Sequence, residues 1–111
     1  HFVGGVLGGS GFTRDRDGEF NTRNLSRQAV VEQIRAAKAD VAMALAKLDP
    51  ARLGEPFPEA IRGHTLPTRR VLVHLITHLS FHLGQLDYHR RAATGDRTSA
   101  EPGGFAQLLD A

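Results

Sequence analysis

The stretch His74–His89, HLITHLSFHLGQLDYH, contains four of the six histidines of the chain and no proline. Its leucines and isoleucine recur at intervals of three and four, which is the spacing of one face of an α-helix. The histidines recur at intervals of four, four and seven, beside the apolar face. The stretch therefore predicts one long amphipathic helix in which a histidine stripe adjoins the apolar stripe.

This helix is predicted to begin near Thr65 and Pro67 and to run to about Ala93, where Gly95 ends it. At roughly 27 residues it would be about 40 Å long at the α-helical rise. Polar side chains beside a core stripe indicate a lined cavity or groove. The apolar stripe comprises Leu72, Leu75, Ile76, Leu79, Leu83 and Leu86, and the polar stripe comprises His74, His78, His82, Gln85 and His89.

A second amphipathic helix is predicted from the N-cap candidate Ser26 to Leu48, before Asp49-Pro50. The segment 1–7 suits the last turns of another helix, because glycines follow it. The polar segment 13–24 is expected to be a surface loop, and the proline-rich segment 51–63 a connector without regular structure. Apolar residues on the second helix are Val30, Ile34, Ala37, Val41, Ala44, Leu45 and Leu48.

The composition indicates an ordinary soluble domain. With 111 residues the chain is long enough for one small core, and 41% of its residues are hydrophobic against 23% charged. No apolar run approaches the ~18 residues of a membrane span, and no signal peptide is recognisable, so we expect a cytoplasmic protein without a membrane partner.

The net charge of +2, with dispersed basic residues, gives no indication of nucleic-acid binding. The absence of cysteine excludes thiolate chemistry on the chain itself.

His78 and His82 are one helical turn apart and can offer two nitrogens to a single metal ion. A third ligand is needed, and His1, His64, His74 and His89 are candidates. Three ligands at i, i+4 and i+8 on one helix span about 12 Å, so the third ligand should come from another helix. The alternative is that these histidines lie at the edge of a core and bond to backbone carbonyls. No G-x-S-x-G pattern supports a serine nucleophile.

The sequence His78-Leu-Ser-Phe-His82-Leu-Gly84-Gln85-Leu resembles the closing motif of the DinB-like metal-binding superfamily, which includes the YfiT-like proteins. The opening His1-Phe-Val-Gly4-Gly5 and the segment Arg14-Asp-Arg-Asp17-Gly-Glu19-Phe20 are similar to two further segments of that family. The resemblance implies an all-α, up-down-up-down four-helix bundle whose first helix is missing from this chain. It places the partial bundle at 1–95 and a flexible tail at 96–111.

By resemblance, the metal ligands are His1, His78 and His82, and the ion is divalent: zinc or nickel in the first place, iron or manganese as alternatives. The implied activity is thiol S-transfer or hydrolysis, with a low-molecular-weight thiol and an electrophile as small-molecule partners. His74 and Gln85 could orient ligands, and Arg14, Arg16 or Arg23 could receive an anionic substrate. A homodimer is also consistent with the family. Two alternatives remain: a non-catalytic metal-binding or stress-response module, and a plain helical interaction domain.

Overall fold

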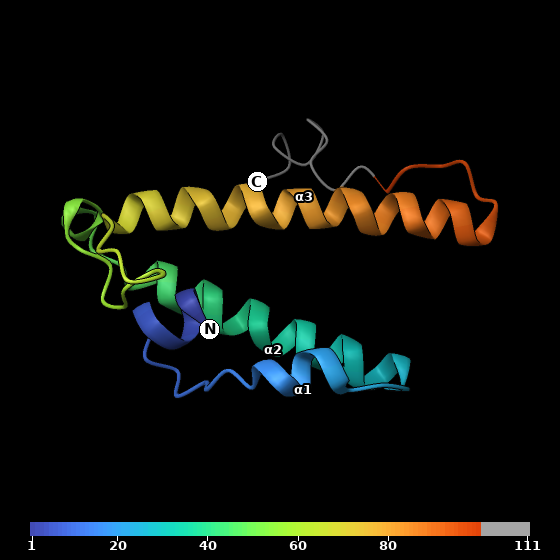
Figure 1. Ribbon diagram of the computed structural model, residues 1–111, viewed down its shortest axis with the longest axis horizontal. Coiled ribbons are helices and arrows are strands. Elements are labelled where there is room, and N and C mark those ends of the chain that lie inside the picture. The colour runs from blue at the N-terminus through green and yellow to red at the C-terminus, as the bar shows by residue number, and fades with distance from the viewer. Residues whose placement is uncertain (101–111) are drawn as a thin grey trace. The chain divides into compact units, whose positions relative to one another are not determined.

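The computed structural model describes residues 1–100, and Figure 1 shows their helices. These are the π-helix η1 (Phe2–Leu7), α1 (Arg16–Asn21), α2 (Arg27–Ala46), the 3₁₀-helix η2 (Pro50–Gly54) and α3 (Thr68–Thr94). The only β-structure within residues 1–100 is two isolated bridges, so the all-α prediction is confirmed. The chain divides into two compact units, His1–Arg69 and Arg70–Ala111. The up-down-up-down bundle stays a prediction.

Helix α2 begins where the sequence predicts. The side chain of Ser26 accepts a hydrogen bond from the backbone N–H of Ala29 over 3.1 Å, which satisfies one of the free donors of the first turn. The helix ends at Ala46, before Asp49-Pro50. Its apolar stripe is only partly covered within the described structure, because Ala44 is buried while Ile34 is 62% exposed.

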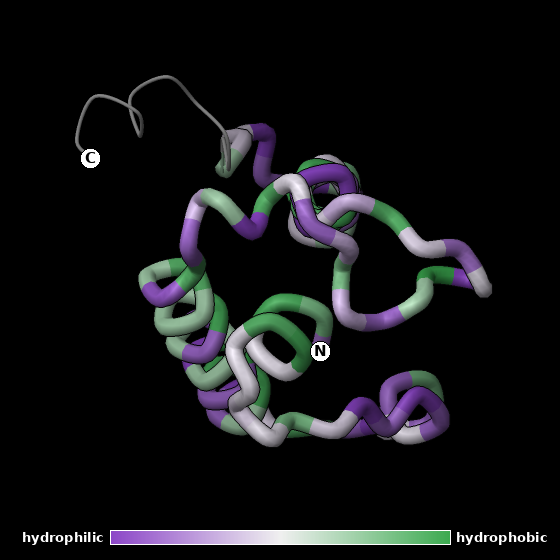
Figure 2. Tube along the Cα trace, turned by 90° about the vertical axis from the view of Figure 1, so that its left-hand side faces the viewer, coloured by the Kyte–Doolittle hydropathy of each residue, from purple (hydrophilic) through white to green (hydrophobic). Residues whose placement is uncertain are grey.

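The predicted helix end at 1–7 is confirmed, and its helix is of the wide π type. The N–H of Val6 donates to the carbonyl of His1 over 3.0 Å, a bond that spans five residues. η1 lies against α2 (Figure 1), and Figure 2 shows it as a mainly hydrophobic segment beginning at the N label. A Cβ on Gly4 would lie 2.7 Å from Asp40 Cβ, and one on Gly8 would lie 2.6 Å from Ala44 Cβ. Glycine at these positions therefore permits the close approach of η1 to α2.

The surface loop predicted for 13–24 is wrong at its centre, which forms the short helix α1. Its first turn is stabilised by Asp15, whose side chain accepts a hydrogen bond from the N–H of Gly18 over 2.9 Å. Within the same segment, Arg14 and Glu19 form an ion pair with a closest distance of 2.6 Å. The capping side chain of Asp15 thus stabilises the start of a six-residue helix in an otherwise polar segment.

The connector 51–63 contains more regular structure than its prolines suggest. Asp49 caps the 3₁₀-helix η2 through the N–H of Ala51. Further on, Ile61 and His64 exchange two backbone hydrogen bonds around Arg62 and Gly63, whose φ angles are +51° and +80°. Positive φ at both central residues is typical of a type I′ turn.

The connector also contributes to the core of the first unit. Phe57 is only 3% exposed, and its ring lies edge-on to that of Phe2 at 6.2 Å. The carbonyl of Glu55 accepts hydrogen bonds from both the N–H and the hydroxyl of Thr68, which starts α3. The chain is thus anchored at the point where the long helix begins.

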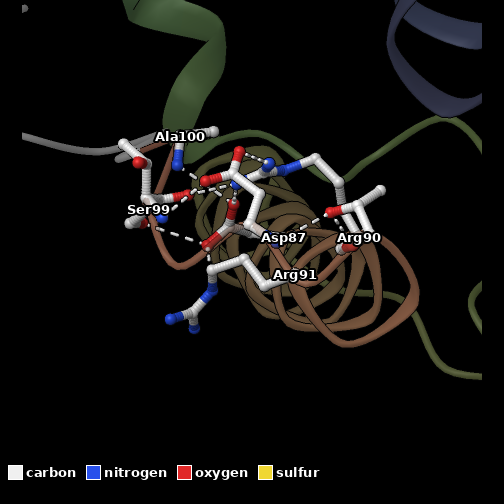
Figure 3. Close-up of polar contacts among 8 residues, drawn as sticks. Asp87, Arg90, Arg91, Ser99 and Ala100 are labelled. Carbon is white, nitrogen blue, oxygen red and sulfur yellow. Dashed lines mark hydrogen bonds and ion pairs between the residues drawn. The ribbon is translucent and has the colours of Figure 1, made fainter.

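Helix α3 ends as predicted at Gly95, which has a φ of +71° and donates its N–H to the carbonyl of Arg91 over 3.0 Å. Residues 96–100 then turn back onto α3, where the side chains of Asp87 and Arg90 contact them (Figure 3). Of the flexible tail predicted at 96–111, residues 101–111 lie outside the described residues. The domain boundary predicted at residue 95 stays a prediction.

Candidate functional site

His78 and His82 direct their rings to one point beside α3. Their Nε2 atoms are 3.2 Å apart, and the two rings meet edge to face with centroids 4.5 Å apart. The helix positions them because residues four apart lie one above the other on the same face. The spacing of four residues thus brings the two ring nitrogens close together, while their role as metal ligands stays a prediction.

Two neighbours on the polar stripe contact this pair. Gln85 Oε1 lies 2.9 Å from His82 Nδ1, and the ring of His74 stacks on that of His78 with centroids 5.6 Å apart. His82 and Gln85 also line a hollow of about 400 Å³ together with Leu86 and His89. Every member of the predicted polar stripe therefore belongs to a single contiguous surface of α3.

His1 belongs to the first unit, where its ring is held by two contacts. Its Nε2 is 3.1 Å from Glu59 Oε2, and its ring lies edge-on to Phe2 at 4.9 Å. His1 also lines a groove of about 780 Å³ formed by η1, α1 and α2, together with the apolar stripe of α2. His64, another ligand candidate, lies in the tight turn of the connector.

The three arginines predicted to receive an anionic substrate are engaged within their own segment. The carboxylate of Glu19 raises the pKa of Arg14, and the same hydrogen bonds lower the pKa of Glu19. Arg23 donates to the carbonyls of Phe20 and Thr22. The guanidinium of Arg16 lies over the ring of Phe20, 5.5 Å from its centroid, and makes no hydrogen bond within residues 1–100. The N–H donors of the Arg16 guanidinium are therefore available for a ligand.

One polar cluster was missed by the sequence reasoning. Asp87 is 8% exposed and is surrounded by Arg90, Arg91, Ser99 and the N–H of Ala100 (Figure 3). The N–H of Ala100, assisted by the arginine and serine side chains, lowers the pKa of Asp87. The available signal was an aspartate three and four residues before Arg90-Arg91, which places the charges on one helix face.

Neither unit, within residues 1–100, contains a group of three or more His, Asp and Glu side chains gathered around one point. The pair His78 and His82 brings two ring nitrogens, which are possible metal donors, to one point on α3. In the same described part of the chain, every helix is too short or too polar to cross a membrane.

Comparison with known proteins gives one result. The family model of the DinB superfamily matches residues 2–86, more than half of the chain, and this range includes both His78 and His82. No curated protein and no solved structure gives a significant match. The matched range covers η1, α1, α2 and most of α3. The chain belongs to the DinB superfamily.

Proposed function

We propose that the protein binds a divalent metal ion through His78 and His82, with His1 as the third ligand, and that it is a metal-dependent thiol S-transferase or hydrolase. The observation that carries the proposal is the 3.2 Å separation of the two Nε2 atoms. Two metal–nitrogen bonds of about 2.1 Å that end on atoms this far apart enclose an angle of about 100°. That angle lies between octahedral and tetrahedral values, so the pair fits a single ion.

His1 is assigned as the third ligand because it matches the family motif. His74 is not assigned, because three side chains at i, i+4 and i+8 on one straight helix are too far apart to bind a single ion. His74 instead stacks its ring on His78. The contact of His1 Nε2 with Glu59 leaves Nδ1 as the nitrogen for a metal. A carboxylate on the other ring nitrogen is the usual companion of a ligand histidine, because it orients the ring and raises its basicity.

A bound divalent ion would supply the positive charge that keeps a low-molecular-weight thiol deprotonated. Three neutral imidazoles leave a coordination position open for this purpose. All-nitrogen donors suit zinc or nickel, and they also accept iron or manganese. The residues of the chain would then orient the reactants: His74 through its contact with His78, and Arg16 by receiving an anionic group of the electrophile.

The alternative is a metal-binding module without catalysis. The pairing of Arg14 with Glu19 and of Arg23 with backbone carbonyls favours it, because two of the three proposed substrate-binding guanidiniums already have partners. In this case the metal would stabilise the fold without turnover. Arg16 is the remaining candidate for receiving an anionic substrate, because its guanidinium makes no hydrogen bond within residues 1–100.

Metal content tests the proposal. The protein would be isolated without an affinity tag, equilibrated with zinc, and analysed by mass spectrometry beside His78→Ala/His82→Ala and the control His89→Ala. We expect near-stoichiometric zinc in the wild type and the control, and none in the double variant. Equal zinc in all three proteins would overturn the assignment of the ligands.

Turnover then separates the enzyme from the module. The zinc-loaded protein would be mixed with a low-molecular-weight thiol and a chlorinated aromatic electrophile, and the thioether product measured. Product that requires both zinc and His82 supports the transferase. A rise in melting temperature with zinc and no product, with thiol or with ester substrates, supports the non-catalytic module.

A further inference from the structure

Gln85 decides which nitrogen of His82 carries hydrogen. Its Oε1 lies 2.9 Å from His82 Nδ1. An amide oxygen can only accept a hydrogen bond, so Nδ1 must donate. A neutral imidazole has one N–H, and the lone pair is then on Nε2. This is the atom that lies 3.2 Å from Nε2 of His78.

We propose that Gln85 is a positioning residue that holds His82 in its Nδ1–H tautomer, so that the Nε2 lone pair is presented in advance at the metal site. The role of this tautomer in metal binding rests on the proposed function, whereas the tautomer itself can be observed in the metal-free protein. Gln85 reaches His82 because the two residues are three apart on α3, one turn from each other.

The arrangement makes the histidine pair asymmetric. Two lone pairs cannot face each other at 3.2 Å, so His78 must donate its Nε2–H to Nε2 of His82. Binding an ion between the two atoms requires His78 to move its hydrogen to Nδ1, whereas His82 needs no change. His82 therefore already has the tautomer that binds the ion, whereas His78 must change its tautomer on binding.

Packing alone does not impose this state on His82. The residue is exposed, and its ring meets that of Phe81 edge to face with centroids 5.5 Å apart. The amide of Gln85 is therefore the contact that selects the tautomer, and it does so without adding charge beside the ion. Removal of such an outer partner of a ligand histidine typically weakens metal affinity 10- to 100-fold.

Long-range ¹H–¹⁵N correlation of the imidazoles tests the inference on the metal-free, full chain at pH 8.5, where free imidazole is neutral. We expect Nδ1–H for His82 and Nε2–H for His78. Addition of zinc should convert His78 to Nδ1–H and leave His82 as it was. In Gln85→Leu, His82 should lose the Nδ1–H preference, and zinc affinity should fall about 10- to 100-fold.

Two variants control the experiment. Gln85→Glu keeps an acceptor oxygen at the same reach and should restore the Nδ1–H tautomer, whereas Gln28→Leu on α2 should change neither tautomer nor affinity. If His82 carries its hydrogen on Nε2 in the wild type, or if Gln85→Leu leaves its tautomer unchanged, the inference is wrong. If the tautomers are as stated but no zinc binds, the inference on Gln85 stands and the proposed metal function fails.

Discussion

The backbone N–H of Ala100 donates a hydrogen bond of 3.0 Å to Oδ1 of Asp87, 13 residues earlier in the chain. The other carboxylate oxygen accepts from the hydroxyl of Ser99 over 3.0 Å. Arg90 approaches the same carboxylate at 3.1 Å and Arg91 at 3.2 Å, the latter as an ion pair without hydrogen-bond geometry. From the same helix, Arg90 also donates hydrogen bonds to the carboxylate of Asp96 and to the carbonyl of Thr98. Asp87 and Arg90 together thus attach the segment after Gly95 to helix α3.

We predict that this attachment is lost in acid. The pKa of Asp87 is lowered in the folded chain, chiefly by the N–H of Ala100, and the pKa of Asp96 is lowered chiefly by the N–H of Thr98. A lowered folded pKa means that the stabilisation is complete above the unfolded value of about 3.9 and is lost as pH falls through the folded value. Heteronuclear NOE values of residues 96–100, recorded from pH 7 down to pH 2, should stay constant to about pH 4 and then decrease.

Asp87→Asn should weaken the attachment at pH 7, because an amide offers the arginines no charge and accepts through one atom only. The NOE values of residues 96–100 should fall part of the way to their low-pH level, because the ion pair of Arg90 with Asp96 remains. Asp17→Asn in α1 is the matched control and should leave them unchanged. Unaltered NOE values in Asp87→Asn would show that residues 96–100 are held by other contacts.

The sequence predicted those parts of the structure that depend on local periodicity and capping. Helix α2 follows from Ser26 and the apolar repeat that begins at Val30. Helix α3 ends at Gly95, because glycine readily adopts the positive φ angle that terminates a helix. The meeting of His78 and His82 also follows from their spacing of four. In each of these instances the interacting residues are within four positions of each other.

What the sequence did not reveal depends on contacts between residues far apart in the chain. The pairing of Asp87 with Ala100 spans 13 residues, and that of His1 with Glu59 spans 58. No helical or strand period connects such partners. The helix α1 was missed for a different reason: a single capping side chain, Asp15, outweighed the low helix propensity of a polar, glycine-containing segment.

Gly8→Ala should destabilise the first unit. Its Cβ would lie 2.6 Å from Ala44 Cβ and 2.8 Å from the carbonyl oxygen of Gly4, so η1 would have to move away from α2. Overpacking of this kind costs about 1–3 kcal/mol, which urea unfolding measures as a lower midpoint.

The matched control for Gly8→Ala is Gly84→Ala, at a glycine within α3 where a Cβ would meet nothing within 4 Å. Alanine there should stabilise the helix by up to about 1 kcal/mol. An increase in the urea midpoint for both variants would mean that η1 and α2 can accommodate a Cβ on Gly8 despite its short distances to neighbouring atoms.

Ser26→Ala should cost about 1 kcal/mol of unfolding free energy, because the N–H of Ala29 loses its acceptor at the start of α2. Ser80→Ala tests the same substitution within α3, where the hydroxyl only donates to the carbonyl of Ile76 and caps nothing. Its effect should be close to zero. Equal losses in the two variants would show that the cap contributes nothing beyond a generic serine hydroxyl.

Glu59→Gln should weaken zinc binding about 10- to 100-fold if His1 is the third ligand, as is typical when a ligand histidine loses its outer partner. In the wild type the carboxylate of Glu59 lies 3.1 Å from Nε2 of His1, and this contact both orients the ring and favours the lone pair on Nδ1. The affinity would be measured by competition with a chromophoric chelator. Glu55→Gln is the control in the same connector, because Glu55 pairs with Arg52 at 3.5 Å and contacts no histidine. Tighter binding in Glu59→Gln would instead mean that the carboxylate competes with the metal for His1, so that the ligand nitrogen would be Nε2.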